Sequence, residues 1–538
     1  MPSYTRSERF LSLFTTLRAG EGRSAYLLCA QSFLIMLAYY LLKVIREPLI
    51  LADGSAELKA YTTAVQAFLL MFIVPVFARL YQRASSRNEK HHLFRNSLLF
   101  FLLNLVAFGV AYKLGWHIGI VFYVWLGIFS VMVLALFWAF AADLFNLKSG
   151  QRIFPLIAAS SALGALLGSG LAGELYLRVD HDGVIYCAAL LLAIPWWLSA
   201  RTEHCVPADS KSHVSAPLDV RPYPFTEGFQ VVWRNRYLTL IAGFVILLNL
   251  INTNGEYILA TFVTEQVHSG ATDSTAEDYI TLFYSKYLFL TTLISFLIQL
   301  FLVSRIFDRI GIAGALYILP ILMLINYSLI ALIPILAVAR AALIAENSVY
   351  YSLQTTTRHA LFLPVNRQEK YVGKHTIDTF LFRLGDVFSG GFVYLASAVI
   401  GLGIVGFVMI NIILATALLY TSRAIGRGHH TAAAEHLSNR PPVLITPLQD
   451  LSIPAGQSSQ LDLAADTFVD NDVGDALRYQ AYLFYAQKLP NWIKFDGLNQ
   501  RFEFNPPRNI KGSSKIRVVA RDFEGLEAES SFTLTWGP

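Results

Sequence analysis

Long apolar runs recur through most of this chain, from Ala25 to about Ser422. Each run is long enough to cross a hydrocarbon core of about 30 Å as a helix. The composition agrees, because 55% of the residues are hydrophobic and 15% are charged, whereas soluble proteins average about 45–50% and about 25%. The chain is therefore predicted to be a polytopic membrane protein, not a soluble enzyme, a disordered chain or a disulfide scaffold. We identify twelve runs, centred near residues 33, 69, 104, 129, 163, 191, 248, 291, 322, 344, 391 and 411.

The twelve runs fall into two groups of six. The longest gap between runs, residues 201–236, follows the sixth run and is polar. Two six-helix halves around a midplane site are typical of major facilitator transporters. We therefore predict an all-α membrane domain of twelve transmembrane helices in a 6+6 major-facilitator arrangement. Its halves would be residues 25–200 and 237–422, with 201–236 as a cytoplasmic central loop.

Lysine and arginine concentrate before the first run and in the loops that follow even-numbered runs. Positively charged loops stay in the cytoplasm, so both chain ends are predicted to be cytoplasmic. Residues 1–24 lack a signal-peptide core and a cleavage site. The short terminus and the absence of a transit peptide, together with the family resemblance described below, favour a bacterial inner membrane. Their apolar residues share one helical face, so they form either an interfacial amphipathic helix or a frayed terminus. The loop cations include Arg79, Arg83, Arg201, Arg305, Arg309, Arg358 and Lys374.

The composition changes after Ser422. Residues 423–440 are predicted to form a polar linker with an alanine-rich turn. Residues 441–538 show short alternating runs, such as Gln460–Leu463 and Arg501–Phe504, separated by Asn, Asp, Gly and Pro clusters. This pattern is typical of a small all-β sandwich of the cadherin or immunoglobulin type.

Ionisable residues inside the first run indicate a functional site, because charge within the membrane is costly. Lys43 and Arg46 lie three residues apart at the end of the run, beside Tyr40, and so share a helix face. Two cations there would suit an anionic substrate. The alternative is that both side chains snorkel to the interface.

The seventh run carries a polar segment from Asn249 to Tyr257. Its amide and hydroxyl side chains would be expensive to expose to lipid. We therefore predict that Asn252 and Glu256 line a cavity, and that Asn254-Gly255 locally unwinds the helix, as in the broken helices of transporter sites.

Charged side chains also occur in the tenth and eleventh runs. Arg340 and Glu346 belong to the tenth, and Arg383 and Asp386 lie three residues apart in the eleventh. One interpretation is structural pairing between neighbouring helices. The other makes Arg340 or Arg383 a substrate cation, and Glu346 or Asp386 a counter-charge or proton carrier.

Several chemistries have no support in the sequence. There is no nucleotide-cradling glycine loop followed by Lys-Ser/Thr, no Ser/His/Asp set and no HExxH helix, so we expect neither an ATP-driven pump nor an enzyme, and no cofactor. The net charge of +5 is too small for a nucleic-acid partner. The three cysteines have no metal-binding spacing.

The polar segments resemble the bacterial and plastid nucleotide translocases, the ATP/ADP antiporters with a major facilitator fold. The matching stretches together span about residues 25–422 in the expected order. They are YYLLKVIREPLIL (39–51), LFWAFAADLFNLKSGQRIFPLIA (136–158), LLNLINTNGEYIL (247–259), ENSVYYSLQTTTRHALFLPVNRQEKY (346–371) and IDTFLFRLGD (377–386).

This resemblance implies a set of charged site positions. Arg46 falls where the family has an essential lysine, and the family's seventh-span glutamate falls near Asn252, one turn before Glu256. The fourth-span glutamate falls near Leu126 or Gly127, and the late lysine falls near Asp386. The smaller number of cations favours a substrate less charged than ATP; the alternative is that Arg340 and Arg383 compensate for the missing cations.

The C-terminal part resembles the dystroglycan-type cadherin-like domain, through NRPPV (439–443), DTFVDNDVGDALRY (466–479), LPNWIKFD (489–496) and ARD (520–522). Domains of this type suggest Ca²⁺ binding by Asp470, Asp472, Asp475 and Asp522. The alternative is that these aspartates cap their own turns. Residues 441–538 would then serve to bind a protein partner or a second copy of the chain.

Two functions follow from these features. The first is a secondary active transporter that uses exchange or symport to carry an anionic or polar small-molecule solute, with a nucleotide among the candidates. The second is a membrane-embedded sensor or scaffold that signals through its β domain and does not transport. The buried charges favour transport, because a scaffold has no need of them.

Overall fold

The computed structural model forms two compact units, residues 1–361 with 372–427, and residues 362–371 with 428–538. Each unit is described by itself. The described residues are 22–52, 54–86, 90–145, 147–202, 205, 225–269, 275–365, 369–438, 441–464, 466–470, 477–484, 489–497, 499–507, 511–522 and 526–537. The predicted amphipathic segment 1–24 therefore lies almost wholly outside them.

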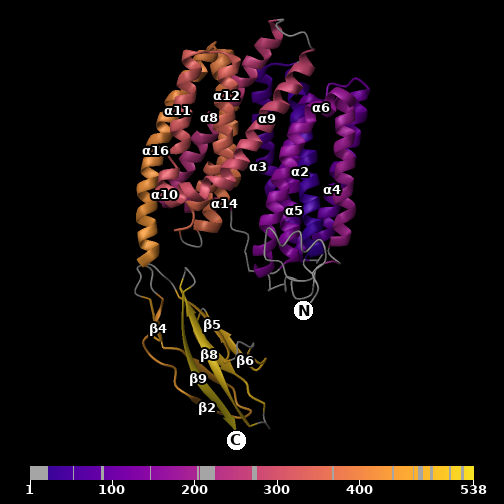
Figure 1. Cartoon of the computed structure of the whole chain (residues 1–538). Helices are drawn as coiled ribbons and strands as arrows, with labels where there is room; N and C mark the ends of the chain where they lie inside the picture. The colour runs from indigo at the N-terminus through magenta and orange to yellow at the C-terminus, as the bar shows by residue number, and fades with distance from the viewer. Residues whose placement is uncertain are drawn as a thin grey trace. The chain divides into compact units, whose positions relative to one another are not determined.

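The first half of the helical unit consists of long apolar helices (Figure 1). They are α2 (Gly22–Leu51), α3 (Ala56–Ser86), α4 (Lys90–Lys113), α5 (Gly119–Leu144) and α6 (Leu147–Thr202). Because α6 has 56 residues, it would be about 80 Å long if straight. It breaks at Asp180, where φ is 62°. This break separates the two runs predicted around residues 163 and 191.

The second half contains shorter and more irregular segments. Its α-helices are α7 (Phe225–Arg234), α8 (Arg236–His268), α9 (Ala276–Phe301), α10 (Val303–Ala315), α11 (Ile318–Leu332), α12 (Leu336–Val349), α13 (Thr355–Ala360), α14 (Lys374–Thr376), α15 (Phe382–Val393) and α16 (Ile404–Ser438). Four π-helical segments interrupt them within the described ranges: η3 (Tyr350–Gln354), η4 (Glu369–Gly373), η5 (Ile377–Leu381) and η6 (Tyr394–Val399).

The helices make the chain an integral membrane protein. Among the described residues, eight helices are long and apolar enough to cross a membrane, or nine if the bent pair α10–α11 forms one span. All twelve predicted centres fall within helical segments. The total of twelve spans stays a prediction.

Three local expectations differ from the structure. The segment 423–438 continues α16 as helix, because its run of alanines has high helix propensity. The central loop contains α7, which packs against α8 and α14. The prediction that Asn254-Gly255 unwinds the seventh span is wrong, since α8 runs unbroken through both residues.

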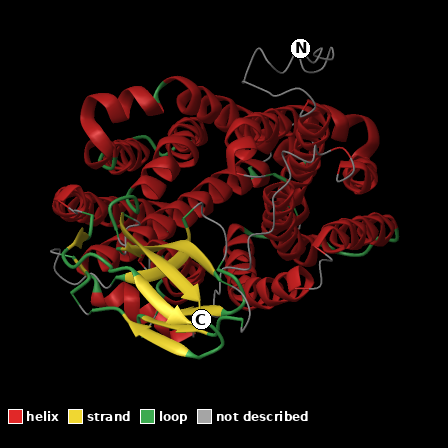
Figure 2. Ribbon diagram, turned by 90° about the horizontal axis from the view of Figure 1, so that it is seen from below, coloured by secondary structure: helices red, strands yellow, loops and turns green. Residues whose placement is uncertain are grey.

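All the described strands belong to the C-terminal unit (yellow in Figure 2). β2, β9, β8 and β5 form one sheet in that order; β3, β7 and β6 form a second, and β1 pairs with β4. The strands are β1 (Val443–Leu444), β2 (Leu451–Pro454), β3 (Ser459–Asp462), β4 (Phe468–Val469), β5 (Arg478–Leu483), β6 (Ile493–Asp496), β7 (Arg501–Phe504), β8 (Gly512–Arg521) and β9 (Glu527–Gly537).

The two larger sheets share one apolar core, as a β-sandwich requires. Phe502 and Phe504 of the second sheet pack with Ile516, Phe532 and Leu534 of the first. Register places Ile516 opposite Phe532 in the antiparallel pair β8–β9. The alternation of buried and exposed residues along β7 and β9 matches the alternating sequence runs. The predicted β-sandwich is therefore confirmed.

Candidate functional site

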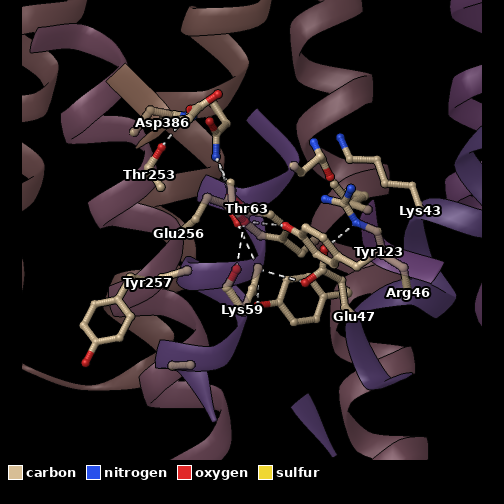
Figure 3. Close-up of a pocket in the computed structure, with 18 of the residues that line it drawn as sticks. Lys43, Arg46, Glu47, Lys59, Thr63, Tyr123, Thr253, Glu256, Tyr257 and Asp386 are labelled. Carbon is tan, nitrogen blue, oxygen red and sulfur yellow. Dashed lines mark hydrogen bonds and ion pairs between the residues drawn. The ribbon is translucent and has the colours of Figure 1, made fainter. Parts of the chain in front are cut away.

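A cavity of about 170 Å³ lies between the two halves of the helical unit (Figure 3). Its walls come from α2, α3 and α5 of the first half and from α8, α9, α12, η3 and α15 of the second. They combine cations, carboxylates, amides and tyrosines with a few small or apolar residues. The lining residues are Lys43, Arg46, Glu47, Ala56, Lys59, Ala60, Thr63, Gln66, Tyr123, Asn252, Thr253, Glu256, Tyr257, Tyr284, Tyr287, Leu288, Thr291, Asn347, Tyr351 and Asp386.

Lys59 connects the charges of the two halves. Its Nζ lies 2.8 Å from Oε2 of Glu47 and 3.5 Å from Oε2 of Glu256. It also donates to the hydroxyl of Tyr284 over 3.4 Å. Figure 3 shows Lys59 between the two carboxylates, which come from α2 and α8. The buried ammonium group is thus neutralised by one carboxylate from each half.

Arg46 is also neutralised within the first half. Its Nε donates to Oε1 of Glu47 over 3.0 Å, and its guanidinium lies 4.3 Å from the ring centre of Tyr123. The hydroxyl of Tyr123 is 3.0 Å from that of Thr63. A cation over an aromatic face is attracted by the ring quadrupole. These contacts hold Arg46 against the wall that α5 and α3 provide.

Lys43 is held by aromatic rings instead of carboxylates. Its Nζ lies 5.2 Å from the ring centre of Tyr40 in α2 and 5.7 Å from that of Tyr351 in η3. None of the described carboxylates forms an ion pair with it. Lys43 therefore presents the least compensated positive charge that the described residues bring to the cavity.

Polar groups of the second half orient Glu256. Its Oε1 accepts from Tyr287 over 3.4 Å and from the Asn347 amide over 3.3 Å. The same amide donates to the Tyr287 hydroxyl over 2.6 Å. Glu256 belongs to α8, Tyr287 to α9 and Asn347 to α12, so three helices fix one carboxylate.

Asp386 provides a third carboxylate in the cavity. Its Oδ1 accepts from the amide of Asn249 over 2.6 Å and from the hydroxyl of Thr253 over 3.2 Å. Its Oδ2 lies 3.7 Å from Nη1 of Arg383. The polar segment of α8 thus serves both to line the cavity and to bind α15.

The structure brings together five of the nine residues predicted to bind substrate, namely Lys43, Arg46, Asn252, Glu256 and Asp386. Tyr40 and Arg383 stand behind this group, against Lys43 and Asp386 respectively.

The structure places the remaining two predicted residues away from the cavity. Glu346 is buried between helices, where its Oε1 accepts from Tyr327 over 3.2 Å. Arg340 lines a different cavity, between α9 and α12.

Sequence reasoning missed Lys59, Gln66 and the tyrosines of α5 and α9. Lys59 lies in the first turn of α3, where a lysine would ordinarily snorkel to the interface. The sequence signal that could have identified Lys59 was its place beside an odd-numbered loop, where the positive-inside rule disfavours lysine.

Gln66 fills the space beside Gly127, where a Cβ would lie 2.0 Å from Cδ of Gln66. A residue larger than glycine at position 127 would therefore have to displace the Gln66 amide.

Two of the predicted calcium ligands of the β unit, Asp470 and Asp522, lie within the described residues. Asp472 and Asp475 lie outside the described residues. Asp522 is buried, and its Oδ1 accepts from the backbone N–H of Leu526 over 2.8 Å, which is the turn-capping alternative. Within the described ranges, no group of three or more possible metal ligands occurs. Calcium binding by Asp470 and the other aspartates stays a prediction.

Further polar contacts join the halves at one end of the bundle. This end carries the loop between α2 and α3 and the other loops that follow odd-numbered runs. Tyr257 donates to Oε1 of Glu57 over 3.0 Å, and Tyr176 donates to Oδ1 of Asp278 over 2.7 Å. Nδ1 of His181, beside the break in α6, lies 3.4 Å from Oε2 of Glu277. The halves are therefore in contact at this end of the bundle.

The chain is similar in sequence to two nucleotide carriers. It is 25% identical over 303 residues to ADP,ATP carrier protein 1 of Chlamydia trachomatis, covering 49% of this chain and 55% of that protein. The corresponding carrier of Chlamydia muridarum is 24% identical over the same length and coverage. The match thus spans about half the length of these relatives, in agreement with the resemblance seen in the polar segments.

Solved transporter structures share the architecture of most of this chain. The nucleoside transporter NupG superposes with a TM-score of 0.52 at 12% identity, covering 76% of this chain and 98% of that one. A POT family transporter in complex with 5-aminolevulinic acid gives 0.56 at 12% identity, with coverage of 76% and 96%. The helical unit has a transporter fold. The β unit matches the family model described as "Putative Ig domain" over residues 441–537.

Proposed function

We propose that this chain is a secondary active transporter that carries a polar metabolite with an anionic group by alternating access. The transporter fold and the partial similarity to ADP,ATP carriers support this class of function. The cavity supports it further, because it lies between two halves that contact each other through polar and charged groups. No step of this activity requires a covalent reaction.

The uncompensated charge of Lys43 is the main observation that supports an anionic substrate. Its ammonium group faces the cavity beside Tyr40 and Tyr351, and the described residues give it no carboxylate. An anionic group of the substrate would complete its ion pair, and the tyrosine rings would pack on a planar or apolar part. Nucleotides combine both features and are one candidate class.

The remaining charges limit how anionic the substrate can be. The cavity holds the cations Lys43, Arg46 and Lys59, together with the carboxylates of Glu47, Glu256 and Asp386. Glu47 and Glu256 already neutralise Arg46 and Lys59. We therefore expect a substrate with less charge than ATP.

The small cavity volume supports a conformational cycle. Ligand pockets usually measure about 300–1,000 Å³, whereas this cavity measures about 170 Å³. A nucleotide-sized solute would need the halves to separate further. With the predicted cytoplasmic termini, the end near Glu57 and Asp278, where the halves are in contact, would face away from the cytoplasm in a bacterial inner membrane.

Thermal stabilisation of the purified full chain in detergent tests the proposal. The panel comprises nucleoside mono-, di- and triphosphates, nucleosides, nucleobases, sugar phosphates and amino acids. A ligand at 100 times its Kd stabilises the folded state by about 2.7 kcal/mol. We expect a hit among singly or doubly charged anions, followed by uptake or exchange of that compound in proteoliposomes.

Lys43→Gln and Lys286→Gln form a matched pair for this test. Lys286 is exposed on α9, outside the central cavity. Lys43→Gln should abolish the stabilisation, and Lys286→Gln should preserve it. Silence across the panel with an intact fold would contradict the transporter proposal and favour the sensor or scaffold.

A further inference from the structure

A second cavity, of about 700 Å³, lies between α9 and α12 and shares no lining residue with the central one. Its walls are mostly apolar, and its polar side chains are those of one glutamine, one tyrosine and one arginine. The lining residues are Gln266, Tyr279, Phe283, Leu290, Ile294, Leu336, Ala337, Arg340, Ala341, Ile344 and Ala345.

The cavity is a long groove with small residues on one side. Ala337, Ala341 and Ala345 recur at four-residue spacing and so follow one face of α12. Ala337 and Ala341 are exposed. On α9 the lining extends from Tyr279 to Ile294, a rise of about 22 Å at about 1.5 Å per residue. This length and polarity match an extended hydrocarbon chain.

Arg340 places a positive charge in this apolar groove. Its guanidinium lies 5.9 Å from the ring centre of Phe283 and is half-buried. In the described part of the chain it has neither a hydrogen-bond partner nor an ion-pair partner. A cation within a membrane span is costly unless an anion compensates it, so the groove has a place for a negatively charged group.

We propose that this groove binds an anionic phospholipid, with its phosphate on Arg340 and one acyl chain along α9 and α12. A guanidinium matches the geometry of phosphate oxygens through parallel N–H donors. The apolar walls on either side of Arg340 would be left exposed by a small soluble anion, whereas an acyl chain covers them. Phospholipid is also the anion that surrounds a transmembrane helix at high concentration.

The purified full chain in a non-ionic detergent provides the test. Its thermal midpoint is measured with phosphatidylglycerol, with phosphatidylcholine of identical acyl chains, and with glycerol 3-phosphate. We expect phosphatidylglycerol to raise the midpoint by about 2–5 °C more than phosphatidylcholine, in line with mass-action stabilisation. Glycerol 3-phosphate should have no effect.

Two variants locate the effect. Arg340→Gln removes the charge and should abolish the preference for phosphatidylglycerol. Its control is Arg201→Gln, because Arg201 is an exposed arginine that stacks on Trp197 outside the groove. Ala341→Leu fills the groove at an exposed position and should abolish the response to both lipids, which keeps the test valid if Arg340→Gln does not fold.

Three results would overturn the proposal. The first is equal stabilisation by the two lipids, which would remove the role of charge. The second is a phosphatidylglycerol preference that survives both Arg340→Gln and Ala341→Leu, since it would place the lipid elsewhere. The third is full stabilisation by glycerol 3-phosphate, which would indicate a soluble anion site.

Discussion

Lys59 of α3 forms an ion pair with Glu256 of α8, with 3.5 Å between Nζ and Oε2, and so joins the two halves of the helical unit through charge. The same ammonium group lies closer to Glu47 of its own half, at 2.8 Å. Separation of the halves would break the first contact and leave the second. Lys59 would therefore keep one carboxylate partner, shared with Arg46, when the halves separate, which costs less than exposing a charge with no partner.

Double-mutant cycles should show that the two partners of Lys59 contribute unequally. The Glu47 side chain is 4% exposed, whereas that of Glu256 is 28% exposed and its distance is longer. We expect a coupling energy of about 1–3 kcal/mol for Lys59→Gln with Glu47→Gln. For Lys59→Gln with Glu256→Gln we expect less than about 1 kcal/mol, as for exposed pairs. Thermal unfolding of the single and double variants and the parent in detergent measures both.

Lys286→Gln serves as the control for loss of a lysine charge on a membrane helix. Its coupling with either glutamate should be zero, because Lys286 lines a separate cavity. A larger coupling for Glu256 than for Glu47 would contradict the idea that the contact between halves is the weaker one.

The sequence was sufficient to place the helices because hydrophobic runs must be buried in lipid wherever they pack. It could not decide which of two neighbouring polar side chains on one helix faces the cavity. Glu346 and Asn347 are adjacent in α12, yet Asn347 faces the cavity and Glu346 packs behind it against Tyr327. That choice depends on the rotation of α12 against α8, α9 and α11, which hydropathy does not report.

Lys59 shows that packing also determines which cavity residues the sequence pattern misses. A lysine in the first turn of a membrane helix is compatible with snorkelling, and only the approach of α8 supplies Glu256 as a partner. To predict which residues of the two halves line a shared cavity, one must know how the halves pack. By contrast, the β-sandwich was predictable, because alternation along β7 and β9 encodes both the strands and their buried face.

Gly255 permits close approach of Tyr327 from α11 and Leu343 from α12 to α8, and this accounts for a glycine in an unbroken helix. A Cβ at this position would lie 2.5 Å from the hydroxyl oxygen of Tyr327. We expect Gly255→Ala to destabilise the helical unit by about 1–3 kcal/mol, the usual cost of overpacking.

Tyr327→Phe should rescue part of the loss in Gly255→Ala, because it removes the nearest atom that the new methyl group would overlap and leaves Leu343 Cδ2 at 3.1 Å. The next atom of that ring, Cζ, lies 3.7 Å away, which is ordinary contact. Thermal midpoints of the two single variants and the double variant give the measurement. If the double variant were as unstable as the sum of the singles, close contact with Tyr327 would not be the reason for the glycine.

Glu346 is expected to be a neutral acid. It is buried, its Oε2 has no hydrogen-bond partner, and the described residues supply no cation for it. An ionised carboxylate in such surroundings would be strongly unfavourable. Glu346→Gln, which keeps the acceptor for Tyr327, should therefore change stability by less than about 1 kcal/mol.

Glu346→Leu gives the contrasting result, because it leaves the buried Tyr327 hydroxyl without its acceptor and should cost about 1–3 kcal/mol. Both variants are compared by thermal unfolding at neutral pH. A loss of about 3–5 kcal/mol in Glu346→Gln would instead reveal a charged carboxylate whose ion pair had been broken.

A core substitution in the β unit should destabilise that unit and leave the helical unit unaffected, because the two are separate compact units. Phe502 is fully buried in the sandwich core, against Phe532 and Phe495. Phe502→Ala should destabilise this unit by about 3–5 kcal/mol. Hydrogen exchange of the full chain should then accelerate in peptides from β8 and β9, while protection in α8 stays unchanged.

Ile445→Ala provides the control, since Ile445 is 56% exposed and its truncation should change stability by less than about 0.5 kcal/mol. Faster exchange in α8 of Phe502→Ala would mean that the helical unit depends on the sandwich for its own stability.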